Sequence, residues 1–355
     1  MISVLLLHLA GRVPAGHPAQ ATAQLIDHLC RFGVPLFLAA HTSALVLQGP
    51  SPVPWARTLA RRLRIVAVPY LLWSALYAGL GLLDGQWTPP QAPAAIAAEI
   101  LLGYTAEQLW YMPAYLGALL LVPLWSGLLY WEPDSRRPTP GTSKLLIALA
   151  AAGLGVQLAG QAWLVQASRV DQAPPMLAGW LLRSEGRSPL HWLGFLTAGL
   201  ALGSLFARGW RPPPWSRWLA GPALLLHFWL ALRPPQAPRF DDFWCSPAMT
   251  GGFALFLLWA WPLVARASTA KSPWLVRLYA GLAGLGRRSL PVYLGHIAWL
   301  RLAWWAVGES WPLPWALLAG LAAMIGGTWV YLPLHDRLFS PRPCARWAPR
   351  AMPPS

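Results

Sequence analysis

The sequence predicts an all-α integral membrane protein, a polytopic helical bundle of about ten transmembrane helices with both termini cytoplasmic. Of the 355 residues, 56% are hydrophobic and only 11% are charged, whereas a soluble domain carries about 25% charged residues. The apolar residues gather in runs of roughly the length that crosses a bilayer. Most basic residues stand in short loops between those runs, which is typical of cytoplasmic loops. These observations exclude an ordinary soluble globular protein.

Ten apolar segments are long enough, or nearly long enough, to span the membrane as helices. They are expected near residues 1–13, 29–48, 63–83, 109–130, 144–166, 189–207, 218–233, 249–266, 288–307 and 314–334. The first of these is short and the seventh is marginal. The apolar stretch 92–106 is too short to span, so we expect it to be a re-entrant or interfacial segment.

The distribution of charge predicts the orientation of the bundle. With the N-terminus inside, most of the 27 Lys and Arg residues lie on the cytoplasmic side and most of the 12 Asp and Glu residues lie outside, as the positive-inside rule requires. Arg301 falls inside an apolar segment. Residues 1–335 are predicted to form one membrane domain, and residues 336–355 are predicted to form a short basic cytoplasmic tail.

Composition also limits the partners and cofactors. The net charge of +15 does not predict a nucleic acid partner, because the basic residues lie beside apolar segments, where they orient helices and contact the lipid bilayer. Cys30, Cys245 and Cys344 are odd in number and lack the spacing of metal ligands. The sequence therefore predicts neither a disulfide framework nor a metal site.

Short motifs at the ends of the predicted helices carry the polar residues of most interest. An Arg-rich turn at the start of the third segment places three cations beside a membrane-buried run, where they either anchor a helix or bind an anionic ligand. In chain order the motifs are Leu5-Leu6-Leu7-His8, Phe32-Gly33-Val34-Pro35-Leu36-Phe37, Arg61-Arg62-Leu63-Arg64 with Val68-Pro69-Tyr70, Gln108-Leu109-Trp110-Tyr111-Met112-Pro113, and Ser289-Leu290-Pro291-Val292-Tyr293-Leu294-Gly295-His296.

The order and spacing of these motifs resemble the acyltransferase-3 family of integral membrane acyltransferases, over residues 1 to about 335. That family typically has a first helix ending in His, a V-P-L-F second helix, a basic R-R-x-x-P-Y turn, an aromatic pair in the fourth helix and a late S-x-x-x-Y-x-x-H. This chain departs from the pattern in three places. It begins too late to supply basic residues ahead of the first helix, it has His41-Thr42 where Ser-Gly is usual, and Gly295 replaces an apolar residue.

The resemblance implies an O-acyltransferase that moves an acyl group, often acetyl, from acyl-CoA. The implied acceptor is a hydroxyl of a cell-envelope carbohydrate or of a small glycosylated molecule. Acetyl-CoA is then a donor substrate, and no metal is required. The chain is rich in Arg, Pro and Trp and poor in Lys, which is typical of a GC-rich bacterial source, so we expect a multi-pass protein of the bacterial inner membrane.

Under this resemblance His8 is the catalytic residue, since a neutral imidazole takes a proton from an attacking hydroxyl. The alternative is a hydrogen-bonded histidine of the core. Arg61, Arg62 and Arg64 are candidates to bind the phosphates of CoA, because guanidinium groups bind such oxygens bidentately. The alternative for the three arginines is plain anchoring at the cytoplasmic surface.

Four further residues are candidates for binding the substrate or supporting the catalytic residue. Tyr293 and His296 are spaced i, i+3 and share one helix face, where they orient the donor, relay a proton or satisfy each other. Trp110 and Tyr111 either line the acceptor pocket or belong to an interfacial aromatic belt. His41 lies in the second segment, where it can partly replace a missing polar contact or simply pack.

Two other functions use the same polar residues. A transporter or flippase of an anionic or lipid-linked glycan would use the intramembrane histidines and arginines for binding and not for chemistry. A catalytically inactive relative would retain the motifs without activity. Consumption of acyl-CoA distinguishes the acyltransferase from both.

Overall fold

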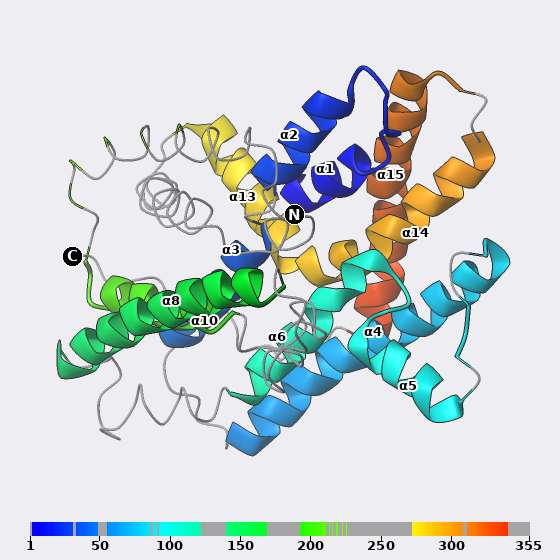
Figure 1. Cartoon of the computed structure of the whole chain (residues 1–355). Coiled ribbons are helices and arrows are strands. Elements are labelled where there is room, and N and C mark those ends of the chain that lie inside the picture. Colours follow the sequence, from blue (N-terminus) through cyan, green and yellow to red (C-terminus); the bar gives the residue numbers. More distant parts are fainter. Residues whose placement is uncertain are drawn as a thin grey trace.

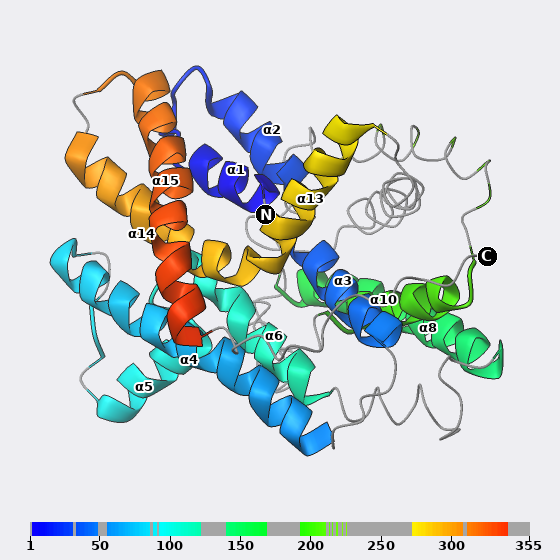
Figure 2. The ribbon, with the colours of Figure 1, turned by 180° about the vertical axis from the view of Figure 1, so that it is seen from behind.

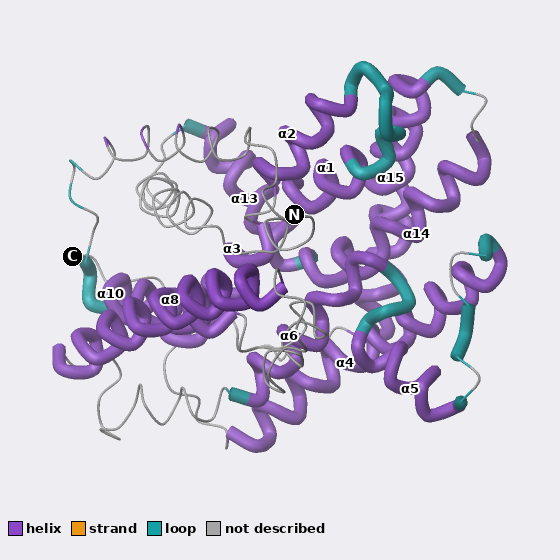
Figure 3. Tube along the Cα trace, in the orientation of Figure 1, coloured by secondary structure: helices purple, strands orange, loops and turns teal. Residues whose placement is uncertain are grey.

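The computed structural model describes residues 2–30, 33–48, 55–85, 88–90, 92–121, 140–168, 192–210, 272–307 and 311–339, with single residues between 213 and 225. Within these ranges every element of regular secondary structure is a helix, as the colours of Figure 3 show. The predicted all-α class is therefore confirmed for the described part of the chain.

The helices are arranged as Figure 1 shows, with α1, α2, α14 and α15 on one side and α3, α8 and α10 on another. In chain order they are α1 (Ile2–Ala10), α2 (Gln20–Cys30), α3 (Gly33–Gln48), α4 (Trp55–Leu83), α5 (Pro93–Leu102), the 3-10 helix η1 (Glu107–Trp110), α6 (Tyr111–Leu120), α8 (Pro140–Ser168), α10 (Leu193–Ala207), α13 (Pro273–Arg287), α14 (Ser289–Val307) and α15 (Leu313–Phe339).

Helices occur at every predicted spanning segment that the structure describes. Segments 218–233 and 249–266 lie almost entirely outside the described residues, so the count of ten spans and the cytoplasmic termini stay predictions. Two described stretches, Leu59–Leu83 and Leu313–Phe339, are long and apolar enough to cross a membrane. The stretch 92–106 contains the ten-residue helix α5, in line with its prediction as too short to span.

The Arg-rich segment is helical, so its prediction as a turn was wrong. α4 begins at Trp55, which places Arg61, Arg62 and Arg64 within its first three turns. The prediction followed hydrophobicity alone and started the helix at residue 63. Arg, Leu and Ala all favour helices, and residues 55–64 contain neither Gly nor Pro, so the helix extends beyond the apolar run.

Two described helices, α2 and α13, were not predicted. Both mix polar residues with apolar ones: α2 contains Gln, Asp and His beside Leu and Ile, and α13 contains Arg277. A helix with only one apolar face has no continuous apolar run, so a search for membrane spans misses it. The signal that finds such helices is the 3.6-residue period of their apolar positions.

Small residues allow α10 to pack closely against α3 and α8, and Figure 2 shows these three helices together. A Cβ atom at Gly199 would lie 2.1 Å from Thr42 Oγ1 and 2.3 Å from the Ala39 carbonyl oxygen. The Ser43 hydroxyl donates a hydrogen bond to the Gly199 carbonyl at 2.7 Å. Close backbone approach with hydroxyl bonds between helices is the usual packing mode in membranes, and here it fixes the position of α3.

Polar contacts join α4 to α14. The Tyr77 hydroxyl donates to the Leu294 carbonyl at 2.8 Å and accepts from the Ala298 amide at 3.0 Å. Arg301, the cation predicted inside an apolar segment, pairs with Asp84 at 3.5 Å, and these two side chains are only 10% and 8% exposed. The pairing compensates a charge that would otherwise be costly to bury.

Candidate active site

A cavity of about 380 Å³ lies between α1, α3, α4, α6 and α14. Its wall is mostly apolar, and its main polar side chains come from four of these helices: Arg62, His41, Tyr111, Tyr115 and Tyr293. Among these described lining residues Arg62 carries the permanent charge, and none is acidic. Such a wall suits a ligand that is apolar along much of its length and anionic at one end.

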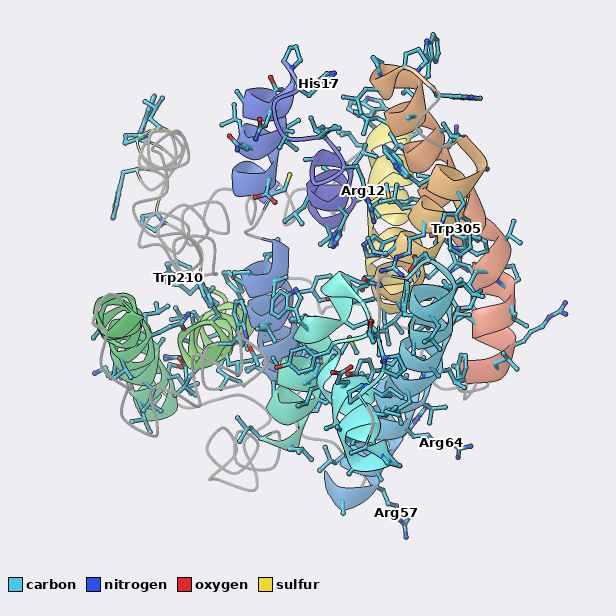
Figure 4. The ribbon with its side chains drawn as sticks, turned by 45° about the vertical axis from the view of Figure 1, so that its right-hand side comes forward. Arg12, His17, Arg57, Arg64, Trp210 and Trp305 are labelled. Atoms are coloured by element: carbon cyan, nitrogen blue, oxygen red, sulfur yellow. The ribbon has the colours of Figure 1, made fainter. Side chains whose placement is uncertain are left out.

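The structure separates the three arginines that the sequence grouped. Arg62 is half-buried and lines the cavity, whereas Arg61 and Arg64 are exposed. In Figure 4 Arg57 and Arg64 project outward from the first turns of α4, at the opposite end of the view from His17. Successive helical residues are rotated by about 100°, so neighbours in sequence point in different directions. Arg62 is therefore the predicted phosphate ligand that reaches the cavity.

His41 and Tyr115 form a polar pair in the cavity wall. The Tyr115 hydroxyl lies 3.1 Å from His41 Nδ1, and Arg62 is near enough to act electrostatically on both residues. His41 Nε2 and the Tyr111 hydroxyl are buried and have no hydrogen-bond partner among the described residues. Sequence reasoning missed Tyr115, although its i, i+4 spacing from Tyr111 places both on one face of α6.

His8 and His296 form a second polar pair, next to the cavity. Their ring centroids lie 5.1 Å apart and the ring planes are tilted by 48°. His296 is completely buried, and its Nδ1 lies 2.7 Å from the Tyr293 carbonyl oxygen and 3.1 Å from that of Val292. Carbonyl oxygens only accept hydrogen bonds, so Nδ1 carries the proton that it donates to them.

The histidine pair lies one helical turn from the cavity along both helices. Val4 lines the cavity, and His8 follows four residues later on the same face of α1. Tyr293 lines the cavity from α14, and His296 follows it by three residues, with ring centroids 5.9 Å apart. One turn advances about 5.4 Å, so both imidazoles lie about one helical turn beyond the cavity wall that Val4 and Tyr293 form.

A continuous row of rings runs from the Arg62 end of the cavity to His8. We call it the aromatic row, and its members are His41, Tyr115, Tyr111, Tyr293, His296 and His8. Successive ring centroids in this order are 5.0, 5.8, 5.6, 5.9 and 5.1 Å apart. The row joins α3, α6, α14 and α1, so it connects segments from both ends of the chain along one side of the cavity.

The aromatic pair of the fourth predicted segment, Trp110 and Tyr111, has one residue at the cavity and one packed elsewhere. Tyr111 is 5% exposed and lines the cavity, whereas Trp110 is half-buried and stacks on the buried Trp192 at 5.8 Å. The backbone carbonyl of Gln108, in η1, accepts a hydrogen bond from the Tyr293 hydroxyl. This contact holds η1 against α14 and so positions Tyr111 at the cavity.

No group of three or more His, Cys, Asp or Glu side chains within the described ranges is placed to hold a metal ion. Cys30 is a buried free cysteine. Cys245 and Cys344 lie outside the described residues.

Comparison with known proteins identifies the family. The family model for an acyltransferase domain, that of the acyltransferase-3 family, matches residues 1–332. The chain belongs to the acyltransferase-3 family. No curated protein and no solved structure gave a significant match.

Membership of the acyltransferase-3 family makes the protein a membrane O-acyltransferase. It also confirms the resemblance found in the motifs of the sequence. An enzyme of this kind needs a site for an acyl donor and a group that accepts the proton of the attacking hydroxyl. The cavity with Arg62 and the histidine pair are the described features suited to these two tasks.

Proposed function

We propose that this acyltransferase moves an acetyl group from acetyl-CoA to a hydroxyl of a cell-envelope carbohydrate or of a small glycosylated acceptor at the bacterial inner membrane. The observation that carries the proposal is the aromatic row, which leads from Arg62 along the cavity to His8 and His296. A cation for phosphate at one end and a base at the other end suit a long CoA thioester lying between them.

The donor end of the proposal rests on Arg62. CoA carries a diphosphate and a 3′-phosphate, and a guanidinium binds such oxygens through charge-assisted hydrogen bonds. Arg62 is half-buried, where less water competes for its charge than at the exposed Arg61 and Arg64. The pantetheine arm then lies along the apolar wall, with the thioester beyond Tyr293.

The chemistry of the proposal takes place at His8. The acceptor hydroxyl oxygen attacks the thioester carbonyl carbon while the His8 imidazole takes the hydroxyl proton. The carbon–sulfur bond then breaks, and the proton passes from His8 to the departing CoA thiolate. His296, whose Nδ1 is fixed by two backbone carbonyls, orients the His8 ring from the side. A two-step route, in which His8 first carries the acyl group, uses the same atoms.

The test measures thiol release from acetyl-CoA by the purified protein in lipid, with and without a cell-envelope extract. We expect extract-dependent release that falls about 10²–10⁴-fold in His8→Ala, the usual contribution of a general base. His17→Ala is the matched control, because His17 lies in the α1–α2 turn, with its Nδ1 accepting the Ala19 amide at 3.1 Å. Unchanged release in His8→Ala would refute the assigned base, and translocation of a glycan without thiol release would favour a transporter.

A further inference from the structure

We propose that His41 is a donor-binding residue of this enzyme, whose Nε2 donates a hydrogen bond to a phosphate oxygen of acyl-CoA beside Arg62. The inference rests on the proposed function, because it needs acyl-CoA in the cavity. It adds a specificity-determining contact from α3, at the position where the family pattern has Ser and this chain has His41.

The first support is the place of His41 in the wall. His41 lines the cavity together with Arg62 and Tyr115, and Arg62 acts on both of them electrostatically. These residues come from α3, α4 and α6, so three helices converge on one end of the cavity. No acidic side chain is among the described residues that line it, so an anion placed there meets no like charge from these residues.

The second support is the hydrogen bonding of the imidazole. One ring nitrogen, Nδ1, lies 3.1 Å from the Tyr115 hydroxyl. The oxygen lone pair of a phenol is delocalised into the ring, so a phenol donates better than it accepts. On this chemical ground we assign Tyr115 as the donor to Nδ1, which leaves the ring proton on Nε2. The pair thus presents a nitrogen–hydrogen donor on the opposite edge of the imidazole.

The third support is that this donor lacks an acceptor. His41 Nε2 is buried and has no partner among the residues that the structure describes. A buried donor without an acceptor is destabilising, so a ligand that brings an oxygen atom to it gains that hydrogen bond. With the Arg62 guanidinium at the same end of the cavity, the oxygen that fits both groups is anionic. The phosphates are the anionic oxygens of acyl-CoA.

Two polar replacements test the two ring nitrogens of His41 separately. His41→Asn keeps an amide near the position of Nδ1, within reach of Tyr115, but removes the Nε2 donor. His41→Gln extends an amide donor to the position of Nε2. We would measure KM and kcat of both variants with acetyl-CoA and with S-acetylpantetheine, which has the same arm and thioester but no phosphate.

We expect His41→Asn to raise KM for acetyl-CoA about tenfold and to leave KM for S-acetylpantetheine within about twofold, as loss of one hydrogen bond to a charged group predicts. His41→Gln should stay within about threefold of the wild type with both donors. Equal KM values for the Asn and Gln variants, or an equal rise for both donors, would overturn the inference, because packing alone would then explain the effect. His17→Phe is the control for a histidine remote from the cavity.

A direct measurement of CoA binding tests the role of His41 even if the proposed function fails. If the wild type releases no thiol from acetyl-CoA, the proposed function fails, and calorimetric titration of CoA into the wild type and His41→Asn in lipid then decides about His41. About tenfold weaker binding by His41→Asn would support the contact. Equal binding, or no binding by the wild type, would overturn it. Thermal unfolding of each variant confirms that the comparison is between folded proteins.

Discussion

At the scale of single residues, the direction of a side chain decides which of several similar residues lines the candidate cavity. Arg61, Arg62 and Arg64 are adjacent in sequence, yet Arg62 alone of the three lines the cavity. The same holds for the aromatic pair, of which Tyr111 lines the cavity and Trp110 stacks on Trp192. A motif identifies a set of candidates, and the direction of each side chain selects among them.

The three arginines give the first prediction at this scale. Arg62→Ala should raise KM for acetyl-CoA about 10- to 100-fold, because a hydrogen bond to a charged group contributes about 1.5–3 kcal/mol. Arg61→Ala and Arg64→Ala should each change KM less than about threefold, since exposed charges contribute about 0–1 kcal/mol. Steady-state kinetics in lipid measure all three, and similar effects of the three variants would show that the phosphates bind at the surface.

The sequence predicted only some residues of the candidate site, and there are physical reasons why it could not predict the others. His8 and His296 were both singled out by the motifs, but nothing in a sequence places residues so far apart in the chain side by side. Tyr115 was missed because a tyrosine in an apolar helix is indistinguishable from a core residue until its neighbours are known. Its partner His41 was recognised only as a polar residue without an assigned contact.

At the scale of helices, hydrophobicity predicted the apolar elements and missed the amphipathic ones. α3, α4, α8, α10, α14 and α15 all coincide with predicted apolar segments, because membrane burial selects continuous apolar runs. α2 and α13 carry polar residues on one face and produce no such run. The start of α4 was placed too late for a related reason, since its first turns are helical but charged.

The packing of α3 against α10 gives a prediction at this scale. Gly199→Ala should destabilise the protein by about 1–3 kcal/mol or more, because the new Cβ atom would meet the backbone oxygen of Ala39 at 2.3 Å. Since α3 carries His41, the shift should also lower activity with acetyl-CoA. Thermal unfolding in detergent and thiol release measure the two effects.

The matched control for this packing is Gly155→Ala on α8. A Cβ atom at Gly155 meets nothing within 4 Å, and Ala favours a helix over Gly by about 1 kcal/mol. This variant should be as stable as the wild type or slightly more stable. If Gly199→Ala were equally harmless, the close approach of α3 and α10 would not fix the position of α3.

At the scale of the whole molecule, helices from the two ends of the family-matched region meet at the candidate site. α1 packs against α14 and α15, so His8 from the first helix meets His296 from a helix near the other end of the chain. Helices α3, α4 and α6 supply the rest of the cavity wall. The family resemblance pointed to motifs on several of these helices, whereas the mutual placement of the helices depends on tertiary packing that no local pattern contains.

The central claim is that one donor molecule lies along the aromatic row, with its phosphates at Arg62 and its acyl group at His8. The most direct measurement is an experimental structure of the protein in lipid with a thioether analogue of acetyl-CoA, which cannot transfer its acetyl group. The account predicts a phosphate oxygen within hydrogen-bond distance of Arg62 and the thioether sulfur on the side of Tyr293 nearest His8 and His296. An analogue bound outside the cavity, or with its sulfur at the Arg62 end, would contradict the account.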